Sequence, residues 1–188
     1  MSEVNNKYNF TNFKIHTQYS ICEGALKIES LKDYTKTNKI KCLGISDTFN
    51  LSGALEFSES MSKVGTQPII GSQINFNFKN NYGLLTIVAK NKTGYQNLVE
   101  LSSLSYLNNK ELSLPTCDLS DLIKNKSGLI VMSGTINGLV GKLFKNDKLD
   151  LIEEIYEKLF NNFGNNFYLE IQRHNDLDEK SFELKNLE

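Results

Sequence analysis

The stretch that decides the fold is IKCLGISDT, residues 40–48, an apolar run that ends in two polar residues. Ile40 to Ser46 has the length and the apolar content of a buried strand, and a helical segment follows it. The same alternation of a short apolar run with a longer helical segment continues along the chain. This pattern is typical of an α/β domain whose strands run parallel.

Five further strands are predicted on the same grounds. Leu84 to Ala89 and the centre of Gly128 to Ser133 are apolar almost throughout, as expected for strands that are covered on both faces. In Phe167 to Gln172, apolar and polar residues alternate instead. The remaining two predicted strands are Phe13 to Ile15 and Pro68 to Phe78.

Helices are predicted between these strands. Thr93 and Gln96 have the spacing of a capping box, which predicts a helix from about Gly94 to Leu107. Asp118 is expected to cap a second, short helix, with Asp121 in its first turn. A third helix is predicted to bury a face whose members recur at three- and four-residue spacing, namely Leu149, Ile152, Tyr156, Leu159 and Phe160.

Composition limits the function classes. The chain has 188 residues with 39% hydrophobic and 23% charged, which excludes disordered and fibrous proteins. A net charge of -1 gives no electrostatic case for nonspecific DNA binding by this segment. The three widely spaced cysteines are interpreted as reduced core residues. Without a secretory signal or a membrane-spanning run, we expect a cytoplasmic location and no membrane contact.

We expect residues 1–188 to form a single α/β domain, because no linker or repeat divides them. Leu177 to Glu188 is a charged, helix-forming segment without a Gly or Pro stop signal. A closed barrel would still need strands after this point. The expectation is therefore a barrel that is incomplete at its C-terminal end.

Polar residues collect where the predicted strands end. Lys14 and His16 accompany the first strand, Asp47 and Thr48 follow the second, Gln73 lies in the third, and His174 follows the sixth. Loops at the carboxyl ends of parallel strands converge on one opening, which is where functional groups of such folds lie. These residues are therefore the candidate site.

Several stretches resemble the PHP domain that opens bacterial DNA polymerase III alpha subunits. They occur in the order and spacing of that family over nearly the whole chain. The matching stretches are FKIHTQYS (13–20), GISDTFNLSGALEF (44–57), PIIG (68–71), TGYQNL (93–98), GLIVMSG (128–134) and FYLEIQRH (167–174). The resemblance implies a PHP-type (β/α) barrel, here lacking its closing strands.

Metal-binding PHP domains hold a metal cluster with His, Asp and Glu, and this chain is similar to them but departs at four positions. Lys14 stands where the first His of a His-x-His pair is expected, and Thr48 where His follows Asp. Gln73 replaces a carboxylate, and Leu84 falls where a His often precedes the strand. A lysine ammonium repels a metal ion, and the other three are weak ligands or none. The resemblance therefore implies a degenerate site without metal.

Three positions of that site remain: His16, Asp47 and His174. The two histidines are either a residual metal pair or hydrogen-bonded structural residues, and the second alternative is favoured because imidazole binds metal usefully only in a complete ligand shell. Asp47 is either a lone ligand or, by preference, a loop or capping residue. A further hypothesis from the fold is that Lys14 pairs with Asp47 and fills the electrostatic place of the metal.

The resemblance implies that the parent protein performs template-directed DNA synthesis with Mg²⁺, through palm carboxylates outside these residues. No catalytic residue and no cofactor are expected within the segment itself. Its expected role is structural, with other polymerase subunits as partners: the proofreading exonuclease subunit first, and the sliding clamp and DNA through the rest of the parent chain. The alternative is a metal-dependent PHP phosphoesterase or exonuclease, against which the depleted ligand set argues.

Overall fold

The computed structural model describes residues 10–107, 114–174 and 176–187. Its centre is a mixed sheet whose strands pair in the order β1-β2-β3-β5-β6. A fourth strand in chain order, β4, pairs in parallel with residues 75–77 of β2, beyond the point where β1 ends. The strands are β1 (Cys42–Thr48), β2 (Gln67–Phe78), β3 (Asn81–Ala89), β4 (Thr116–Asp118), β5 (Leu129–Met132) and β6 (Phe167–Tyr168).

The expectation of an entirely parallel sheet is wrong, because β3 runs antiparallel to both of its neighbours. The reason is a two-residue turn between β2 and β3. Lys79 and Asn80 both have positive φ, 49° and 60°, as in the tight turns whose twist matches that of a hairpin. The chain therefore returns directly instead of crossing over through a helix, while β1 with β2 and β5 with β6 stay parallel.

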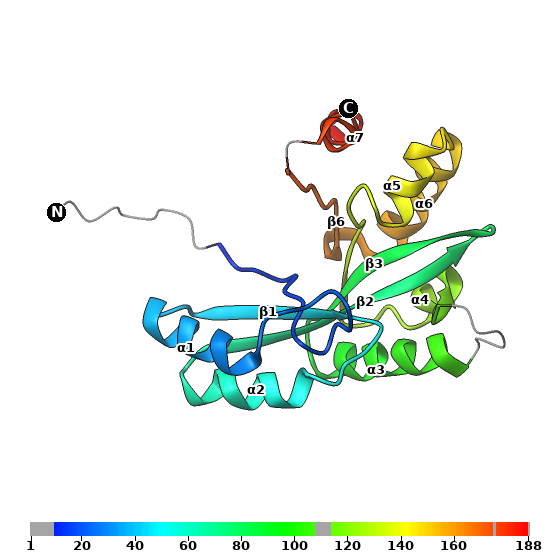
Figure 1. Ribbon diagram of the computed structural model, residues 1–188. Coiled ribbons are helices and arrows are strands. Elements are labelled where there is room, and N and C mark those ends of the chain that lie inside the picture. Colours follow the sequence, from blue (N-terminus) through cyan, green and yellow to red (C-terminus); the bar gives the residue numbers. More distant parts are fainter. Residues whose placement is uncertain (1–9, 108–113, 175, 188) are drawn as a thin grey trace.

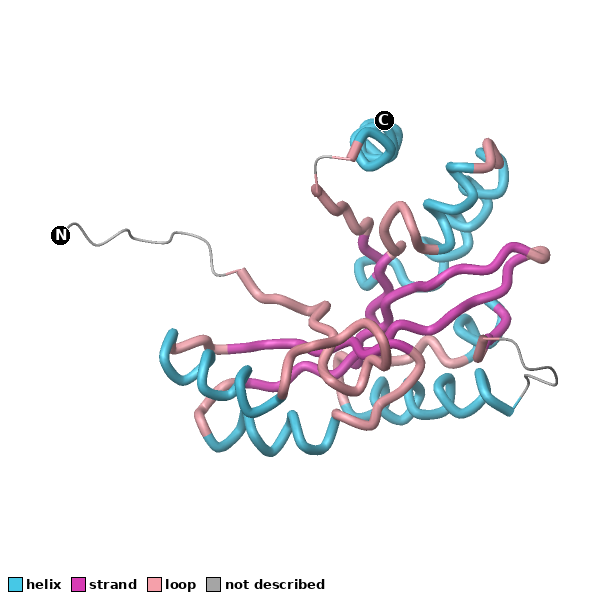
Figure 2. The backbone as a smooth tube through the Cα atoms, in the orientation of Figure 1, coloured by secondary structure: helices cyan, strands magenta, loops and turns pink. Residues whose placement is uncertain are grey.

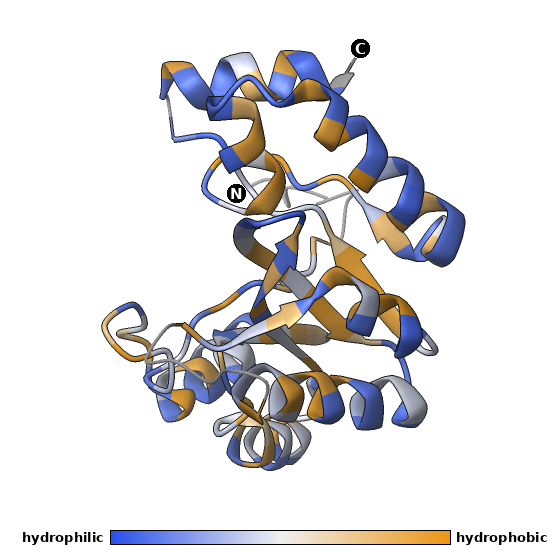
Figure 3. Cartoon of the chain, turned by 90° about the vertical axis from the view of Figure 1, so that its right-hand side faces the viewer, coloured by the Kyte–Doolittle hydropathy of each residue, from blue (hydrophilic) through white to orange (hydrophobic). Residues whose placement is uncertain are grey.

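Helices cover the sheet in two groups. In Figure 1, α1, α2 and α3 lie on one side of the sheet, whereas α5 and α6 lie together beside β3 and α7 lies above β6. Figure 2 shows the same separation of helices and strands, and Figure 3 shows hydrophobic residues concentrated in the central strands. The helices are α1 (Ile28–Asn38), α2 (Ala54–Lys63), α3 (Lys92–Leu107), α4 (Leu119–Lys124), α5 (Leu139–Lys145), α6 (Leu149–Phe163) and α7 (Leu177–Leu187), with a 3₁₀ turn at Gly164–Asn166.

Two helix starts test the predicted caps. Asp118 caps α4 and Asp121 lies in its first turn, as predicted, and the two residues also form a reciprocal capping box. At α3 the predicted box is wrong, because the helix begins at Lys92 and the Asn91 side chain accepts the Gly94 N–H at 2.9 Å. Asn91 caps the helix two residues before the predicted cap Thr93, so the predicted helix is present but its start is displaced.

The core consists of two clusters. The larger lies between the sheet and helices α3 to α7, and includes the fully buried Phe76, Leu98 and Ile155. The smaller joins α1 and α2 to β1, and its members are Ile28, Leu31, Leu43, Ile45, Phe57 and Met61. Among the cysteines only Cys117 is buried, whereas Cys42 is half-buried and Cys22 is exposed, so the interpretation of all three as core residues is wrong.

The first predicted strand appears as an extended segment, residues 12–15, beside β1. The Gly44 N–H donates to Asn12 O at 2.7 Å, and the Ser46 N–H donates to Ile15 O at 2.9 Å. Gly44 permits this approach, since a Cβ there would lie 2.8 Å from Phe13 Cα. The sheet is thus bordered by this segment at one edge and by β6 at the other. It is open and not closed into a barrel, consistent with the predicted incomplete α/β barrel.

No helix of the described ranges is both long and apolar enough to cross a bilayer.

Candidate functional site

A cavity of about 230 Å³ opens among the strand ends and unites four of the predicted positions: Lys14, His16, Gln73 and Leu84. Further walls come from the loop after β5 and from the segment after β6. These additional residues are Gly134, Thr135, Asn137, Gly138 and Gln172, and Glu23 adds to the lining from the loop before α1. The convergence that the predicted topology implied is therefore present.

Asp47 lies at the end of β1 and is almost fully buried. One carboxylate oxygen accepts the Thr17 N–H and the Ser20 hydroxyl, both at 2.6 Å, and the other accepts the Thr17 hydroxyl at 2.7 Å. Ser20 also accepts the Thr48 N–H at 3.1 Å. The carboxylate thus organises the loop of residues 17–20, and its oxygens are already used by short hydrogen bonds inside the protein.

His16 and Thr48 meet at Glu23. The Thr48 hydroxyl donates to Glu23 Oε2 at 2.5 Å, and His16 Nδ1 lies 3.9 Å from the same oxygen. Burial lowers the pKa of His16 below its usual 6.5; the Glu23 carboxylate opposes this shift, and the Lys14 ammonium adds to it. The ring is therefore held preferentially neutral near pH 7.

Lys14 does not pair with Asp47, so that hypothesis is wrong. Its ammonium contacts Glu170 Oε1 at 2.7 Å, and the side chains are only 25% and 15% exposed. Asp47 offers no free oxygen, whereas Glu170 lies just after β6, where its backbone N–H donates to the Ser133 hydroxyl at 3.0 Å. The second oxygen of Glu170, Oε2, is buried without a hydrogen-bond partner.

His174 lies outside the cavity. Its Nδ1 lies 2.9 Å from Glu179 Oε1, its backbone N–H donates to Glu179 Oε2 at 2.6 Å, and its side chain is 64% exposed. The hydrogen bond from His174 lowers the pKa of Glu179. The two histidines are thus not brought together, because His174 is engaged at the start of α7.

These residues do not fit a metal cluster. Within the described part of the chain, no group of three or more His, Cys, Asp or Glu side chains is arranged to hold a metal ion. Both oxygens of Asp47 already accept hydrogen bonds from Thr17 and Ser20, and the ammonium of Lys14 contacts Glu170. The absence of bound metal remains a prediction, and the donor set supports it.

Glu23 and Glu170 were not predicted as site residues. Glu170 belongs to the alternating stretch 167–172, in which it shares a strand face with Tyr168 and Gln172. A carboxylate on that face, together with a lysine in place of a ligand at the opposite edge, was a signal for an ion pair. Glu23 lies in a loop and carried no comparable signal.

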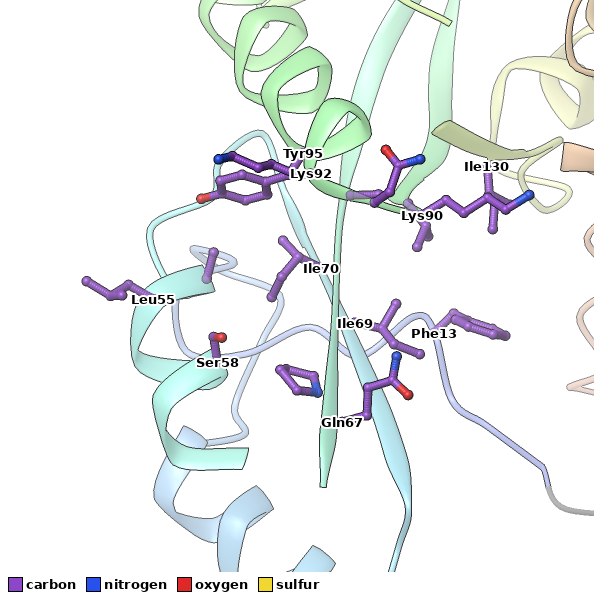
Figure 4. A pocket seen from close by; sticks show the side chains of 15 residues that line it. Phe13, Leu55, Ser58, Gln67, Ile69, Ile70, Lys90, Lys92, Tyr95 and Ile130 are labelled. Atoms are coloured by element: carbon purple, nitrogen blue, oxygen red, sulfur yellow. The ribbon is translucent and has the colours of Figure 1, made fainter. Parts of the chain in front are cut away.

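A second, larger cavity of about 630 Å³ lies at the other end of β2 (Figure 4). Its lining is mainly apolar and includes Leu55 of α2, Ile69 of β2 and Tyr95 of α3. Lys90 and Lys92 contribute the charged groups, and no carboxylate lines it.

Comparison with known proteins places this geometry in a family. Residues 12–174 match the model of the PHP domain. The chain is 34% identical to DNA polymerase III subunit alpha of Rickettsia felis, over 92% of this chain and 14% of the relative. For the Thermus aquaticus protein of the same name, the values are 34%, 94% and 16%. The protein of that name from Borreliella burgdorferi is 35% identical, over 90% of this chain and 16% of the relative.

Among solved structures, a protein from Bifidobacterium adolescentis that is provisionally described as a metal-dependent phosphoesterase superposes with a TM-score of 0.57. It covers 95% of this chain and 83% of its own, at 12% identity, so the likeness concerns the fold alone. In contrast, the chain spans only about one sixth or less of the length of the polymerase relatives named above.

Proposed function

The chain belongs to the PHP domain family, and from that membership we propose that it is the opening domain of a replicative DNA polymerase, the alpha subunit of DNA polymerase III. The observation that carries the proposal is the 34% identity to such subunits over more than nine-tenths of this chain. The parent protein then performs template-directed DNA synthesis in the cytoplasm with Mg²⁺ held by carboxylates outside these residues.

Within that protein, the domain is structural and binds partners. Asp47 and Glu170 are both committed to groups of the same chain, which supports a framework role and not a hydrolytic one. The remaining barrel strands belong to the continuing polypeptide. The partner that we propose first is the proofreading exonuclease subunit, with the sliding clamp and DNA contacted by the rest of the parent chain.

Primer extension by the longer polypeptide tests this function. The extended protein should extend a primed template, residues 1–188 alone should not, and His16→Ala should leave the rate per folded molecule nearly unchanged. Extension by the fragment, or abolished extension in a well-folded His16→Ala enzyme, would contradict the proposal.

The alternative, a metal-dependent phosphoesterase, is favoured only by the fold of the Bifidobacterium protein. Phosphate release from phosphomonoesters by purified protein with Mn²⁺ or Zn²⁺, lost on His16→Ala, would establish it. We expect no such release, because the strand-end carboxylates are saturated or paired with Lys14.

A further inference from the structure

The two edges of the open sheet lie close together. One edge is the extended segment 12–15, bonded to β1 through Gly44 and Ser46, and the other is β6 with the residues that follow it. Phe13 from the first edge and Tyr168 from the second line one cavity of about 300 Å³. The sheet therefore curls until its borders face each other.

Side chains span the gap between these borders. Lys14 follows Phe13 on the first edge, Glu170 follows Tyr168 and Leu169 on the second, and their charged atoms are 2.7 Å apart. Each partner is held by its own side of the sheet. The Ser46 hydroxyl donates to Phe13 O at 2.9 Å and holds the segment of Lys14. The Ser133 hydroxyl accepts the backbone N–H of Glu170 on the other side. The ion pair thus joins two separately held pieces of the sheet.

The environment distinguishes this pair from an ordinary surface pair. Lys79 and Glu154 are 2.5 Å apart, but their side chains are 56% and 33% exposed, and such pairs contribute little because water and salt screen them. Lys14 and Glu170 are 25% and 15% exposed, so removing one partner leaves a poorly solvated charge. Glu170 Oε2, which lacks a hydrogen-bond partner, makes the carboxylate more dependent on Lys14.

Next to the pair lies apolar surface. The 300 Å³ cavity is lined by Phe13, Val88, Ile130, Met132 and Tyr168, all of them apolar or aromatic. Phe13 and Tyr168 are 40% and 53% exposed, and separation of the two edges would expose more of the apolar lining, which is unfavourable. The ion pair and the burial of the remaining lining therefore favour the same closed arrangement.

We propose that the Lys14–Glu170 pair is a clasp that holds the two sheet edges together, so that its release lets segment 12–15 leave β1 and opens the apolar cavity while the rest of the core stays folded. The clasp deepens the structural role proposed above, but it stands on contacts that do not depend on that role.

The reactivity of a cysteine thiol at the first edge can report this opening. Cys42, at the start of β1, is half-buried, with its Sγ 2.9 Å from Thr11 Oγ1, so that departure of the first edge exposes it. Cys117 is buried in the main core and reports global unfolding. Cys22 is exposed and is removed by Cys22→Ser, which leaves one sensor of the edge and one of the core.

The experiment compares thiol modification rates of Cys42 and Cys117 in the Cys22→Ser chain, with and without Lys14→Met. We expect Cys42 to react about tenfold faster, which corresponds to about 1.4 kcal/mol in the free energy of local opening, with Cys117 unchanged. Amide hydrogen exchange of residues 168–172 should rise in parallel, although the substitution lies on the other edge. The matched control, Lys79→Met, should change neither rate.

If the Lys14→Met chain does not fold, Glu170→Gln takes its place in the experiment, because glutamine keeps the shape of the glutamate side chain and removes its charge. The exchanged pair Lys14→Glu with Glu170→Lys should restore slow modification of Cys42. A Cys42 rate within about twofold of the parent in both single variants would overturn the clasp. An equal rise at Cys117 would overturn it too, because the pair would then support only global stability. Neither result would touch the polymerase assignment, which rests on primer extension.

Discussion

Two carboxylates at the strand ends, Asp47 and Glu170, are paired with other groups of the chain in different ways. Asp47 is satisfied locally, by groups of Thr17 and Ser20 in one loop. Glu170 is satisfied by a residue 156 positions away, and one of its oxygens stays unpaired. One carboxylate is thus held within a single loop, whereas the other depends on one long-range ion pair, and we expect the long-range contact to be the easier one to break.

The largest effect is expected at the saturated carboxylate. Asp47→Ala removes the acceptor for one buried N–H and two hydroxyls, which should lower the free energy of unfolding by about 3 kcal/mol or more. Urea unfolding followed by circular dichroism measures this. The exposed Asp33→Ala on α1 is the control and should change stability by less than about 0.5 kcal/mol. If both variants have the same free energy of unfolding, the hydrogen bonds of Asp47 do not stabilise the fold.

Crowding of the first edge should have a smaller and more local effect. Gly44→Ala places a Cβ 2.8 Å from Phe13 Cα, and overpacking of this kind costs about 1–3 kcal/mol. Hydrogen exchange should increase in residues 12–16 and not in α3.

Gly65→Ala is the control for Gly44→Ala, because Gly65 has a φ of 74° but nothing within 4 Å of its added Cβ. It should lower stability through backbone strain alone and leave exchange of residues 12–16 as it was. If exchange of residues 12–16 were equal in both variants, the close contact at Gly44 would not control local opening of the first edge, and the expected difference between the two carboxylates would not extend to that edge.

A still smaller effect should depend on pH. Because burial lowers the pKa of His16 in the folded state, the unfolded chain takes up a proton more readily as the pH falls below 6.5. The free energy of unfolding should therefore decrease as the pH drops from 6.5 toward that lowered pKa. His16→Gln should remove this component, as seen in the difference between the two stability curves from pH 5 to 8. An unchanged curve would show that burial of His16 has no energetic consequence.

Metal addition should have no effect. A ligand at 100 times its Kd would stabilise the fold by about 2.7 kcal/mol, and we expect no shift in the unfolding midpoint with Zn²⁺ or Mn²⁺. Elemental analysis of the purified protein is the direct measurement. Two or more ions per chain, lost on His16→Ala, would show that the strand ends still form a metal site and that the comparison of two metal-free carboxylates is mistaken.

Local sequence patterns predicted the elements but not all of their surroundings. In α6, the predicted face included Phe160, which is 63% exposed, and omitted Ile155 and Phe163, which are buried. Spacings of three and four admit more than one stripe along an amphipathic helix, and the position of the sheet decides between them. Similarly, β6 pairs only at Phe167 and Tyr168, because β5 ends at Met132 and the chain turns at Gly134, which has a φ of 80°.

The candidate site was predictable as a location and not as a set of contacts. His16, Gln73, Lys14 and Leu84 do meet in one cavity, because the short patterns place the strands that carry them, although β3, which carries Leu84, runs antiparallel to its neighbours. The partner of Lys14 depends on how far the sheet curls, which no local pattern records. Local patterns also do not predict that Asp47 accepts hydrogen bonds from Thr17 and Ser20, and these bonds explain why Lys14 pairs with another carboxylate.

The distance along the chain between Lys14 and Glu170 has a consequence for synthesis on the ribosome. Because the two residues are 156 positions apart, at about 5–20 residues per second Glu170 is made about 8 to 30 s after Lys14. During that interval the first edge can already pair with β1, while its lysine has no counterion. Joining of the two edges therefore cannot begin until Glu170 has been made, and a translational pause before codon 170 would prolong the time that Lys14 spends without its counterion.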